Sequence, residues 1–446
     1  ERAIALHMRL SRNKQTHPAQ PSLPPLSAPV SPWLHWWILL TALATLLLVG
    51  AGGLVTSHGV GMAVPDWPNT YGYNMFFFPF SRWVGGIFYE HTHRLLASFV
   101  GLMTAITAVW MFGRKARPFL RWTGVALLVL AGVARATAPA RWSDALVSAL
   151  TGAAALAASF AWPRAKAAPT WLRRLGVLAF LAVVLQGVLG GLRVILLRDQ
   201  IGVFHAALAQ LFFALMCSLA LFTSGWWART AQAHGVQDAA PAANLSWRWL
   251  FPITTLLILA QLVLGAAMRH QHAGLAIPDF PLAYGRLWPA TDPAAVAMYN
   301  QHRLEVVSLN AITGSQIVLQ MVHRLVAVAV LATVGACAWS TRRETGRSQQ
   351  ARQLARLWLG LILIQVSLGA WTVWSNKAAD IATAHVVGGA LSLAVGVLAT
   401  VVSFRGLPLL IRTPARVFVP AAARPGSSPA GAPMLPSPRP AQAATS

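Results

Sequence analysis

The chain consists of long apolar runs separated by short polar or charged segments. Several runs contain no charged residue and reach the ~20 residues that a helix needs to cross a bilayer. They are Trp36–Ser57, Leu95–Gly113, Leu175–Leu192, Ile201–Ala228, Trp249–Met268, Leu325–Thr341, Leu357–Asn376 and Ile381–Phe404. Lipid offers the backbone no hydrogen-bond partner, so such segments are stable only as helices. The pattern therefore predicts an all-α polytopic membrane protein.

The apolar runs form two copies of one unit. In the first copy Gly61–Pro68 precedes Tyr71-Gly72, and in the second Gly274–Pro281 precedes Tyr284-Gly285. Four further segments of the first copy match segments of the second. Gly53-Leu54-Val55 matches Gly265-Ala266-Ala267, and Glu90–Ala97 matches Gln320–Ala327. Gln186–Gly190 matches Gln365–Gly369, and Phe204-His205-Ala206 matches Ala384-His385-Val386. Each unit reads as helix, long loop, helix, helix, short loop, helix. We therefore predict pseudo-duplicated four-helix bundles with eight core transmembrane helices.

Residues 118–163 interrupt the first unit. Ala145–Pro163 is apolar and long enough to span, whereas Phe119–Ala134 is marginal because Arg121 lies near its start. Both units face the same way, so an even number of spans must separate equivalent points. We therefore predict an inserted helical pair and ten spans. The alternative is a pair that lies on the membrane surface or re-enters it.

These patterns set the domain boundaries. Residues 32–228 form an N-terminal four-helix half that carries the insert 118–163, and residues 248–404 form a C-terminal four-helix half. Residues 229–247 are a cytoplasmic linker. The Pro-rich segments 1–31 and 405–446 are expected to be disordered cytoplasmic tails, and the first of them lacks the apolar stretch of a signal peptide.

Charge is sparse and unevenly placed. Only 10% of the residues are charged, mean hydropathy is +0.56, and the formal net charge is +24. Of the 35 Lys and Arg residues, 24 lie in the two tails and in segments 114–121, 164–174, 229–248 and 342–356. All of these lie on one side of the predicted topology, as the positive-inside rule requires of cytoplasmic segments. The asymmetry predicts a multi-pass protein of the cell inner (plasma) membrane with both termini cytoplasmic. We therefore assign the positive charge to an interaction with the lipid bilayer and not with nucleic acid.

Four histidines occupy repeat-equivalent positions near the outer ends of their helices: His93, His205, His323 and His385. One such residue is usually a hydrogen-bonded interior group or a relay. Four at matched places favour a functional set, because ionisable groups inside membranes are expensive. Imidazole is the commonest metal ligand, and facing helices of a bundle build cofactor sites.

We therefore predict one heme per half, with the four imidazoles as axial ligands of the iron. Gly101, Gly388 and Gly389 are expected to let a planar macrocycle approach the backbone. The histidines without a repeat partner are interpreted as structural, namely His58, His91, His270, His272 and His302.

The residue three before the first histidine differs between the copies, being Glu90 in one and Gln320 in the other. A carboxylate can take or give a proton and an amide cannot. Glu90 lies one helical turn from His93, so we expect it on the same face, toward the macrocycle edge. This makes the first half the reactive one, unless Glu90 is only a helix-terminal carboxylate.

Other polar residues have two readings each. Arg94 and Arg324 follow the histidines directly, and they either contact heme propionates or reach the lipid headgroups. Asp66 and Asp279 stand in Pro-Asp-aromatic-Pro, which is typical of a capped turn, with a share in gripping a ligand as the alternative. Cys217 and Cys337 lie in apolar helices without metal-ligand spacing and are interpreted as core residues.

Taken together, several of these motifs resemble the heme A synthase family. They are Glu90–Ala97, the segment Leu-Gln-Gly-Val-Leu-Gly-Gly-Leu-Arg-Val at 185–194, the loop Pro65–Pro68 and the duplicated four-histidine plan. The resemblance covers about 36–112 and 172–404. It implies a membrane enzyme that oxidises the C8 methyl of heme O to a formyl group through a hydroxymethyl intermediate, making heme A for terminal oxidases.

The resemblance also implies roles for the site residues. His323 and His385 would hold a resident heme B that relays electrons, His93 and His205 would hold the substrate heme O, and Glu90 would be the catalytic acid. The implied partners are a heme O synthase, the terminal-oxidase assembly machinery and an electron donor. This chain departs from the family in lacking a cysteine pair in an outer loop and in carrying the insert 118–163.

Two other functions remain open from the residues alone. A diheme b-type membrane cytochrome that only transfers electrons would explain the four histidines but not the difference between Glu90 and Gln320. A heme carrier or exporter would need no acid at all.

Overall fold

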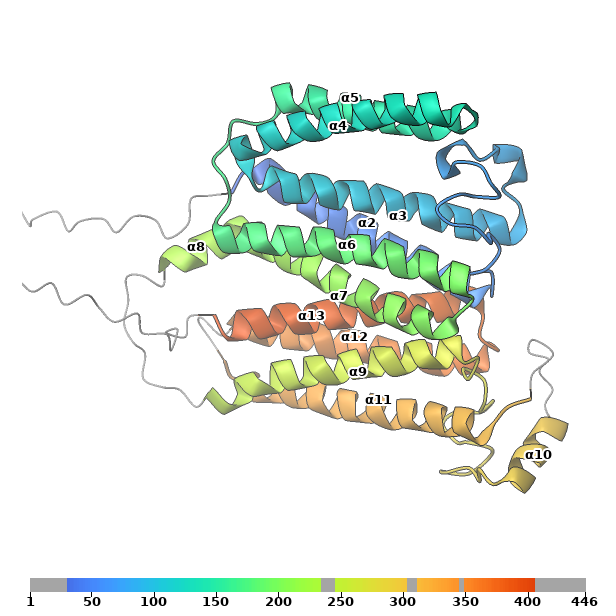
Figure 1. The fold of residues 1–446 in the computed structure, drawn as a ribbon. Coiled ribbons are helices and arrows are strands. Elements are labelled where there is room, and N and C mark those ends of the chain that lie inside the picture. Colours follow the sequence, from blue (N-terminus) through green and yellow to red (C-terminus); the bar gives the residue numbers. More distant parts are fainter. Residues whose placement is uncertain (1–29, 234–244, 303–310, 345–348, 406–446) are drawn as a thin grey trace, which may run out of the picture. The chain divides into compact units, whose positions relative to one another are not determined.

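The computed structural model describes residues 30–233, 245–302, 311–344 and 349–405, and its regular elements are helices (Figure 1). The long helices are α2 (Pro32–Ser57), α3 (Gly85–Trp110), α4 (Ala116–Thr137), α5 (Trp142–Ala161), α6 (Thr170–Leu196), α7 (Asp199–Thr223), α9 (Leu250–His270), α11 (Gly314–Ser340), α12 (Gln349–Trp374) and α13 (Ala379–Ser403). Two shorter ones are α8 (Gly225–Ala233) and α10 (Pro293–Gln301). Ten helices are long and apolar enough to cross a membrane. The predicted class, an all-α polytopic membrane protein, is confirmed.

The core helices close into two rings of four. In the first ring α2 packs on α3, α3 on α6, α6 on α7, and α7 on α2. The second ring repeats this order with α9, α11, α12 and α13. The rings meet where α2 and α7 of the first ring contact α9 and α13 of the second. Each ring therefore has an interior of its own, and the two interiors share a wall.

Small residues bring the shared wall together. A Cβ built at Gly53 of α2 would lie 2.9 Å from Cγ2 of Thr383 on α13. The hydroxyl of Thr383 lies 3.2 Å from that of Ser57, also on α2. Farther along the wall Phe213 packs with Ala390 and Ala394 in one buried cluster. Small side chains permit close backbone approach between membrane helices, so this wall is packed tightly.

The insert is a helical hairpin. Helices α4 and α5 pack mainly on each other, and their backbones cross where a Cβ at Gly124 would lie 2.8 Å from the carbonyl oxygen of Gly152. At one end of the hairpin, Asn74 Nδ2 donates to Asp144 Oδ1 at 2.7 Å. Figure 1 shows the pair running alongside the long helices of the first half. Its length and composition suit the predicted pair of spans.

In the first helix of each unit, the structure pairs equivalent residues of the two copies one position away from the predicted pairing. The partner of Gly265 is Gly52 and not Gly53, since each of these two glycines faces the histidine of the next helix. The chain leaves both helices in the same way, because Gly59 and His272 both have a positive φ. The prediction was wrong because α2 contains Gly50, Gly52 and Gly53, and only packing distinguishes them.

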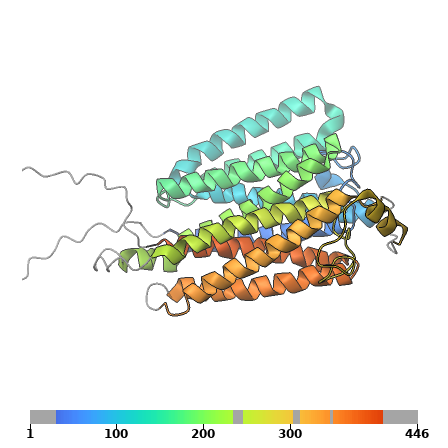
Figure 2. The same cartoon turned by 90° about the horizontal axis from the view of Figure 1, so that it is seen from below.

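The two ends of the bundle differ. The loops that follow α2 and α9, together with α10, lie at one end, and the start of α2 and the end of α13 lie at the other (Figures 1 and 2). The connections α3–α4 and α5–α6 and the residues 341–344 that follow α11 share the second end with their Lys and Arg residues. Most of the predicted tails 1–31 and 405–446 lies outside the described residues. The linker 229–247 is described only at its borders, in α8 and in the 3₁₀ turn Leu245–Trp249.

Ten spans with this arrangement place the loops after α2 and α9 on one side of the membrane. We expect cysteines introduced at Ser81 and Leu287, which are both exposed, to react with an impermeant thiol reagent from that side. A cysteine at Arg343, beyond α11, is the control and should react only from the opposite side. Opposite accessibility of Ser81 and Leu287 would contradict the topology.

Candidate functional site: four histidines at helix interfaces

Each predicted ligand histidine lies against a glycine of the neighbouring helix. A Cβ built on the glycine would lie 3.0 Å (Gly52 to His93), 3.1 Å (Gly190 to His205), 3.3 Å (Gly265 to His323) or 3.3 Å (Gly369 to His385) from Cε1 of the imidazole. Most real side chains do not approach so closely, so a larger residue would push the ring away. The glycines therefore determine where the imidazoles can lie.

The imidazoles are paired within each half and keep a nitrogen for another partner. His93 lies within electrostatic range of His205, and His323 within range of His385. The Nδ1 atoms of His93, His323 and His385 are buried without a hydrogen-bond partner. Buried polar atoms are usually satisfied, so an unsatisfied one needs an explanation. His205 differs, because its Nδ1 lies 3.2 Å from the carbonyl oxygen of Gln186. Two imidazoles per half, three of the four with an unpartnered buried nitrogen, fit a heme held from both faces.

A larger metal cluster does not form in the described part of the chain. No group of three or more His, Cys, Asp or Glu side chains converges there. Cys217 and Cys337 are free thiols inside helices, as expected of core residues. Within those residues, the predicted ligand histidines of each half are therefore not part of a larger cluster.

Three glutamines tie the histidine helices to their neighbours, and sequence reasoning missed this role. The Nε2 atoms of Gln186, Gln261 and Gln365 donate to the backbone carbonyls of His205 (2.8 Å), His323 (3.0 Å) and His385 (2.9 Å). Each glutamine stands four residues before the glycine that faces the same histidine, and this spacing was the available signal. Such bonds between membrane helices contribute about 0.6 kcal/mol each, and up to ~1.7.

The fourth position breaks this pattern. Counting back four residues from Gly52 leads to Leu48, which packs into the apolar cluster of the first ring. The second half therefore ties both of its histidine helices through glutamine, and the first half ties only that of His205. The two sites are built on one plan but differ in how firmly one histidine is held.

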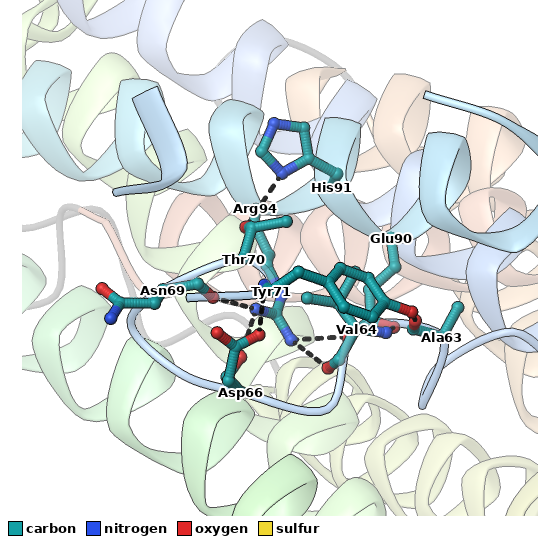
Figure 3. Close-up of polar contacts among 9 residues, drawn as sticks. All are labelled: Ala63, Val64, Asp66, Asn69, Thr70, Tyr71, Glu90, His91 and Arg94. Carbon is teal, nitrogen blue, oxygen red and sulfur yellow. Dashed lines mark hydrogen bonds and ion pairs between the residues drawn. The ribbon is translucent and has the colours of Figure 1, made fainter. Parts of the chain in front are cut away.

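The Glu90 carboxylate faces the loop 58–84 that follows α2 (Figure 3). Its Oε2 accepts from the backbone N–H of Val64 at 2.8 Å, and its Oε1 pairs with Arg94 Nη2 at 2.7 Å. The side chain is 4% exposed. In the second half Gln320 Oε1 accepts from the N–H of Ile277 at 2.7 Å. Glu90 and Gln320 thus hold their loops in the same way, and the ion pair belongs to Glu90.

The two arginines after the histidines also bind these loops. Arg94 donates to the carbonyls of Asp66 (2.6 Å), Asn69 (3.0 Å) and Val64 (2.8 Å), as Figure 3 shows. Arg324 donates to the carbonyls of Asp279 (2.7 Å) and Leu282 (2.8 Å). The structure therefore directs both guanidinium groups to loop carbonyls, a use that neither reading of the sequence anticipated.

The loop aspartates cap turns, as predicted. The carboxylate of Asp66 accepts from the backbone N–H groups of Tyr71 and Gly72 at 2.7 and 2.8 Å. Asp279 accepts from Tyr284 and Gly285 at 2.7 and 2.9 Å. Both loops also contain a cis aromatic–proline bond, at Trp67–Pro68 and at Phe280–Pro281. The repeat is thus conserved down to individual turn hydrogen bonds.

Two of the three predicted macrocycle-facing glycines have protein neighbours instead. A Cβ at Gly388 would lie 2.4 Å from Oε1 of Gln365, and one at Gly389 would lie 2.7 Å from Cδ2 of Leu262. These glycines make room for side chains of the second ring, so the prediction was wrong for them. Gly101 has no atom within 4 Å of such a Cβ.

The remaining histidines make contacts of their own. His91 is fully buried between Phe78 and Trp83, with its Nδ1 3.1 Å from the Thr70 hydroxyl. His58 stacks on Tyr89, and His302 Nδ1 lies 2.9 Å from the carbonyl of Met298. The Nε2 of His91 is buried without a hydrogen-bond partner, and the structural interpretation of the three residues stays a prediction.

Comparison with known proteins bears on this arrangement. A family model described as "Cytochrome oxidase assembly protein" matches residues 134–397. A protein named heme A synthase from Methylobacterium sp. (strain 4-46) is 30% identical over 243 residues, covering 51% of this chain and 64% of its own length. A heme A synthase of Geobacillus kaustophilus is 25% identical over 364 residues, 79% of this chain and 86% of its own length.

Another relative with the same name, from Caulobacter vibrioides, is 27% identical over 135 residues and matches over 36% of its length. The chain thus spans less than two thirds of the Methylobacterium and Caulobacter relatives.

The glycine contacts predict which substitutions displace a ligand. Gly190→Val and Gly369→Val should push His205 and His385 out of place, at a cost of about 1–3 kcal/mol typical of overpacking. Gly187→Val and Gly360→Val lie on the same two helices, face open space, and serve as controls for helix propensity. The measurement is the low-spin two-histidine absorption of the purified protein. A control that lost as much signal as its partner would contradict the steric explanation.

Proposed function

Because the chain belongs to the cytochrome oxidase assembly protein family, which includes the heme A synthases, we propose that it converts heme O to heme A. The reaction oxidises the C8 methyl group of heme O to a formyl group through a hydroxymethyl intermediate. The observation that carries the proposal is the pair of histidines repeated in two rings, each imidazole seated on a glycine. That geometry suits two tetrapyrroles, one in each half.

The two sites take different roles in this proposal. His93 and His205 bind the substrate heme O, and His323 and His385 bind a resident heme B. The glutamine ties support this division, because both helices of the second site are tied and one helix of the first site is not. A resident group benefits from two firmly held ligands, whereas a substrate must enter and leave. When bound, heme B supplies one-electron transfer.

Glu90 is proposed as the proton acceptor of the first site. Loss of protons from the hydroxymethyl group requires a base within reach of the macrocycle edge. Both oxygens of the carboxylate are engaged, by Val64 and Arg94. To act, Glu90 must exchange one of these contacts, and we propose the one with Arg94, because the guanidinium keeps its three loop carbonyls when Glu90 leaves it.

The surroundings of the reaction follow from the same proposal. Heme O would be supplied by a heme O synthase, heme A would pass to the terminal-oxidase assembly machinery, and a separate donor or acceptor would exchange electrons with the resident heme. The sided distribution of Lys and Arg supports placement in the inner (plasma) membrane with both termini cytoplasmic.

A diheme b-type cytochrome is the alternative, and one observation favours it. Glu90 and Gln320 hold their loops with equivalent hydrogen bonds, so Glu90 has a structural role in the loop without acting on a ligand. In that case both hemes would be permanent and only electrons would be exchanged.

Pigment analysis separates the two functions. Expression beside a heme O synthase, in cells without another source of heme A, should yield membranes that contain heme A together with heme B. His323→Ala or His385→Ala should remove the resident low-spin heme B signal. Chromatography of extracted hemes provides the measurement, and heme B alone in the wild type would support the cytochrome.

The Glu90→Gln variant tests the proposed base. Gln320 shows that an amide can accept the loop N–H in this position, so the loop should keep its conformation. We expect heme to bind as before, heme A to fall by roughly 10²–10⁴-fold, and heme O or its hydroxymethyl derivative to accumulate. Gln320→Glu is the matched control and should leave heme A output unchanged. Unchanged output from Glu90→Gln would reduce the carboxylate to a structural group.

A further inference from the structure

One cation beside the first site has no close anionic partner. Arg193 lies in the last turn of α6, with its guanidinium packed on Gly61, where a built Cβ would lie 2.9 Å from Nη1 and 3.0 Å from Nη2. The nearest carboxylate is that of Asp199, at 3.9 Å from Nη2, and its side chain is 55% exposed. The Nε of Arg193 is buried without a hydrogen-bond partner. A charge in a transmembrane helix is costly and usually marks a function.

Arg193 lies within electrostatic range of both histidines of the first site, His93 and His205. Glu90 is also within its range. Arg193 also follows Gly190, the glycine that faces His205, by three residues on the same helix. The cation therefore lies on the side of the first site where α6 ends.

The second half has no cation in this place. Thr372 is the repeat-equivalent of Arg193, because Gly190 corresponds to Gly369 and each residue follows its glycine by three positions. The hydroxyl of Thr372 donates to the carbonyl of Leu368 in its own helix at 2.8 Å. The charge is therefore a property of the first site and not of the shared plan.

Other arginines of the same region are already occupied. Arg94 and Arg324 bind loop carbonyls, as described above. Arg269 Nη2 donates to the carbonyl of Gly53 and to the hydroxyl of Ser57, both at 2.9 Å, and joins the two rings. Within the described ranges, Arg193 pairs with Asp199 at 3.9 Å and its Nε has no hydrogen-bond partner, so this guanidinium can donate to a ligand.

We propose that Arg193 binds a carboxylate on the edge of the tetrapyrrole held by His93 and His205. This rests on the proposed function, since it takes the first site to be the heme O site. A guanidinium and a carboxylate form two parallel hydrogen bonds, which fix direction as well as distance. The contact sets the rotation of the macrocycle about the axis between the two imidazoles, and so decides which edge faces Glu90. Asp199 holds the guanidinium until the carboxylate of the ligand replaces it.

Combined changes in the protein and in the ligand test the contact between Arg193 and the carboxylate of the ligand. The protein, purified with its resident heme, is placed in zwitterionic nanodiscs and titrated with heme O or with heme O whose propionates are methyl esters. Wild type should bind the free acid more tightly than the ester by about 10- to 100-fold, the range for a hydrogen bond between charged groups. In Arg193→Gln this preference should fall to near one, with ester binding unchanged. Arg193→Lys should keep part of it.

Asp199→Asn should have the opposite effect to Arg193→Gln, so misfolding cannot explain both results. Removing the competing carboxylate should tighten binding of the free acid and leave the ester unaffected. Arg94→Gln is the control for general damage to the loop, and it should change acid and ester binding by the same factor.

Two outcomes would overturn the assignment. One is an equal loss of acid and ester binding in Arg193→Gln, which indicates a structural role. The other is an acid preference that survives in Arg193→Gln, as expected if the guanidinium binds a lipid phosphate instead. Heme A output of the wild type is measured separately. Absence of heme A with an intact acid preference would refute the enzymatic function and leave the carboxylate contact standing.

Discussion

An imidazole can lie inside an apolar bundle only where the next helix leaves room for it and its nitrogens find partners. Glycine supplies the room at all four positions, and each contact is close enough that a larger residue would have to displace the imidazole. The helices must therefore cross at the level of the histidines, and the rings close around that level. Everything else at the site, from the glutamine ties to the loop hydrogen bonds, depends on this crossing.

Apart from the inserted hairpin and α10, three substitutions distinguish the first site from the second. Leu48 stands where the second half has Gln261, Glu90 where it has Gln320, and Arg193 where it has Thr372. One change releases a tie to a histidine helix and two add charge. A duplicated scaffold thus contains one site whose two histidine helices are both tied by glutamine, and one that has an additional carboxylate, Glu90, and an additional cation, Arg193. Charge inside a membrane destabilises the fold unless it is used, so the asymmetry agrees with chemistry in the first half.

The loop over the first site connects these features. Arg94 binds three of its carbonyls and also Glu90, while the Glu90 carboxylate binds its backbone at Val64. The same loop contacts the inserted hairpin through Asn74 and Asp144. A disturbance of the hairpin or of the loop would therefore reach Glu90 through a short series of hydrogen bonds. The second loop makes the equivalent contacts through Gln320 and Arg324, without the ion pair.

The sequence by itself determined the helices, the duplication, the four histidines and the capped turns of Asp66 and Asp279. These depend on local periodicity and on the comparison of one copy with the other, and both can be read along the chain. Only the tertiary structure decided which glycine faces which histidine, that Glu90 and Arg94 bind the loop, and that Gly388 and Gly389 accommodate Gln365 and Leu262. The place of Arg193 relative to the first site was likewise visible only in the tertiary structure. Spacing along a helix determines on which face of the helix a residue lies. The direction of a long side chain depends on its contacts with residues that are distant in the sequence.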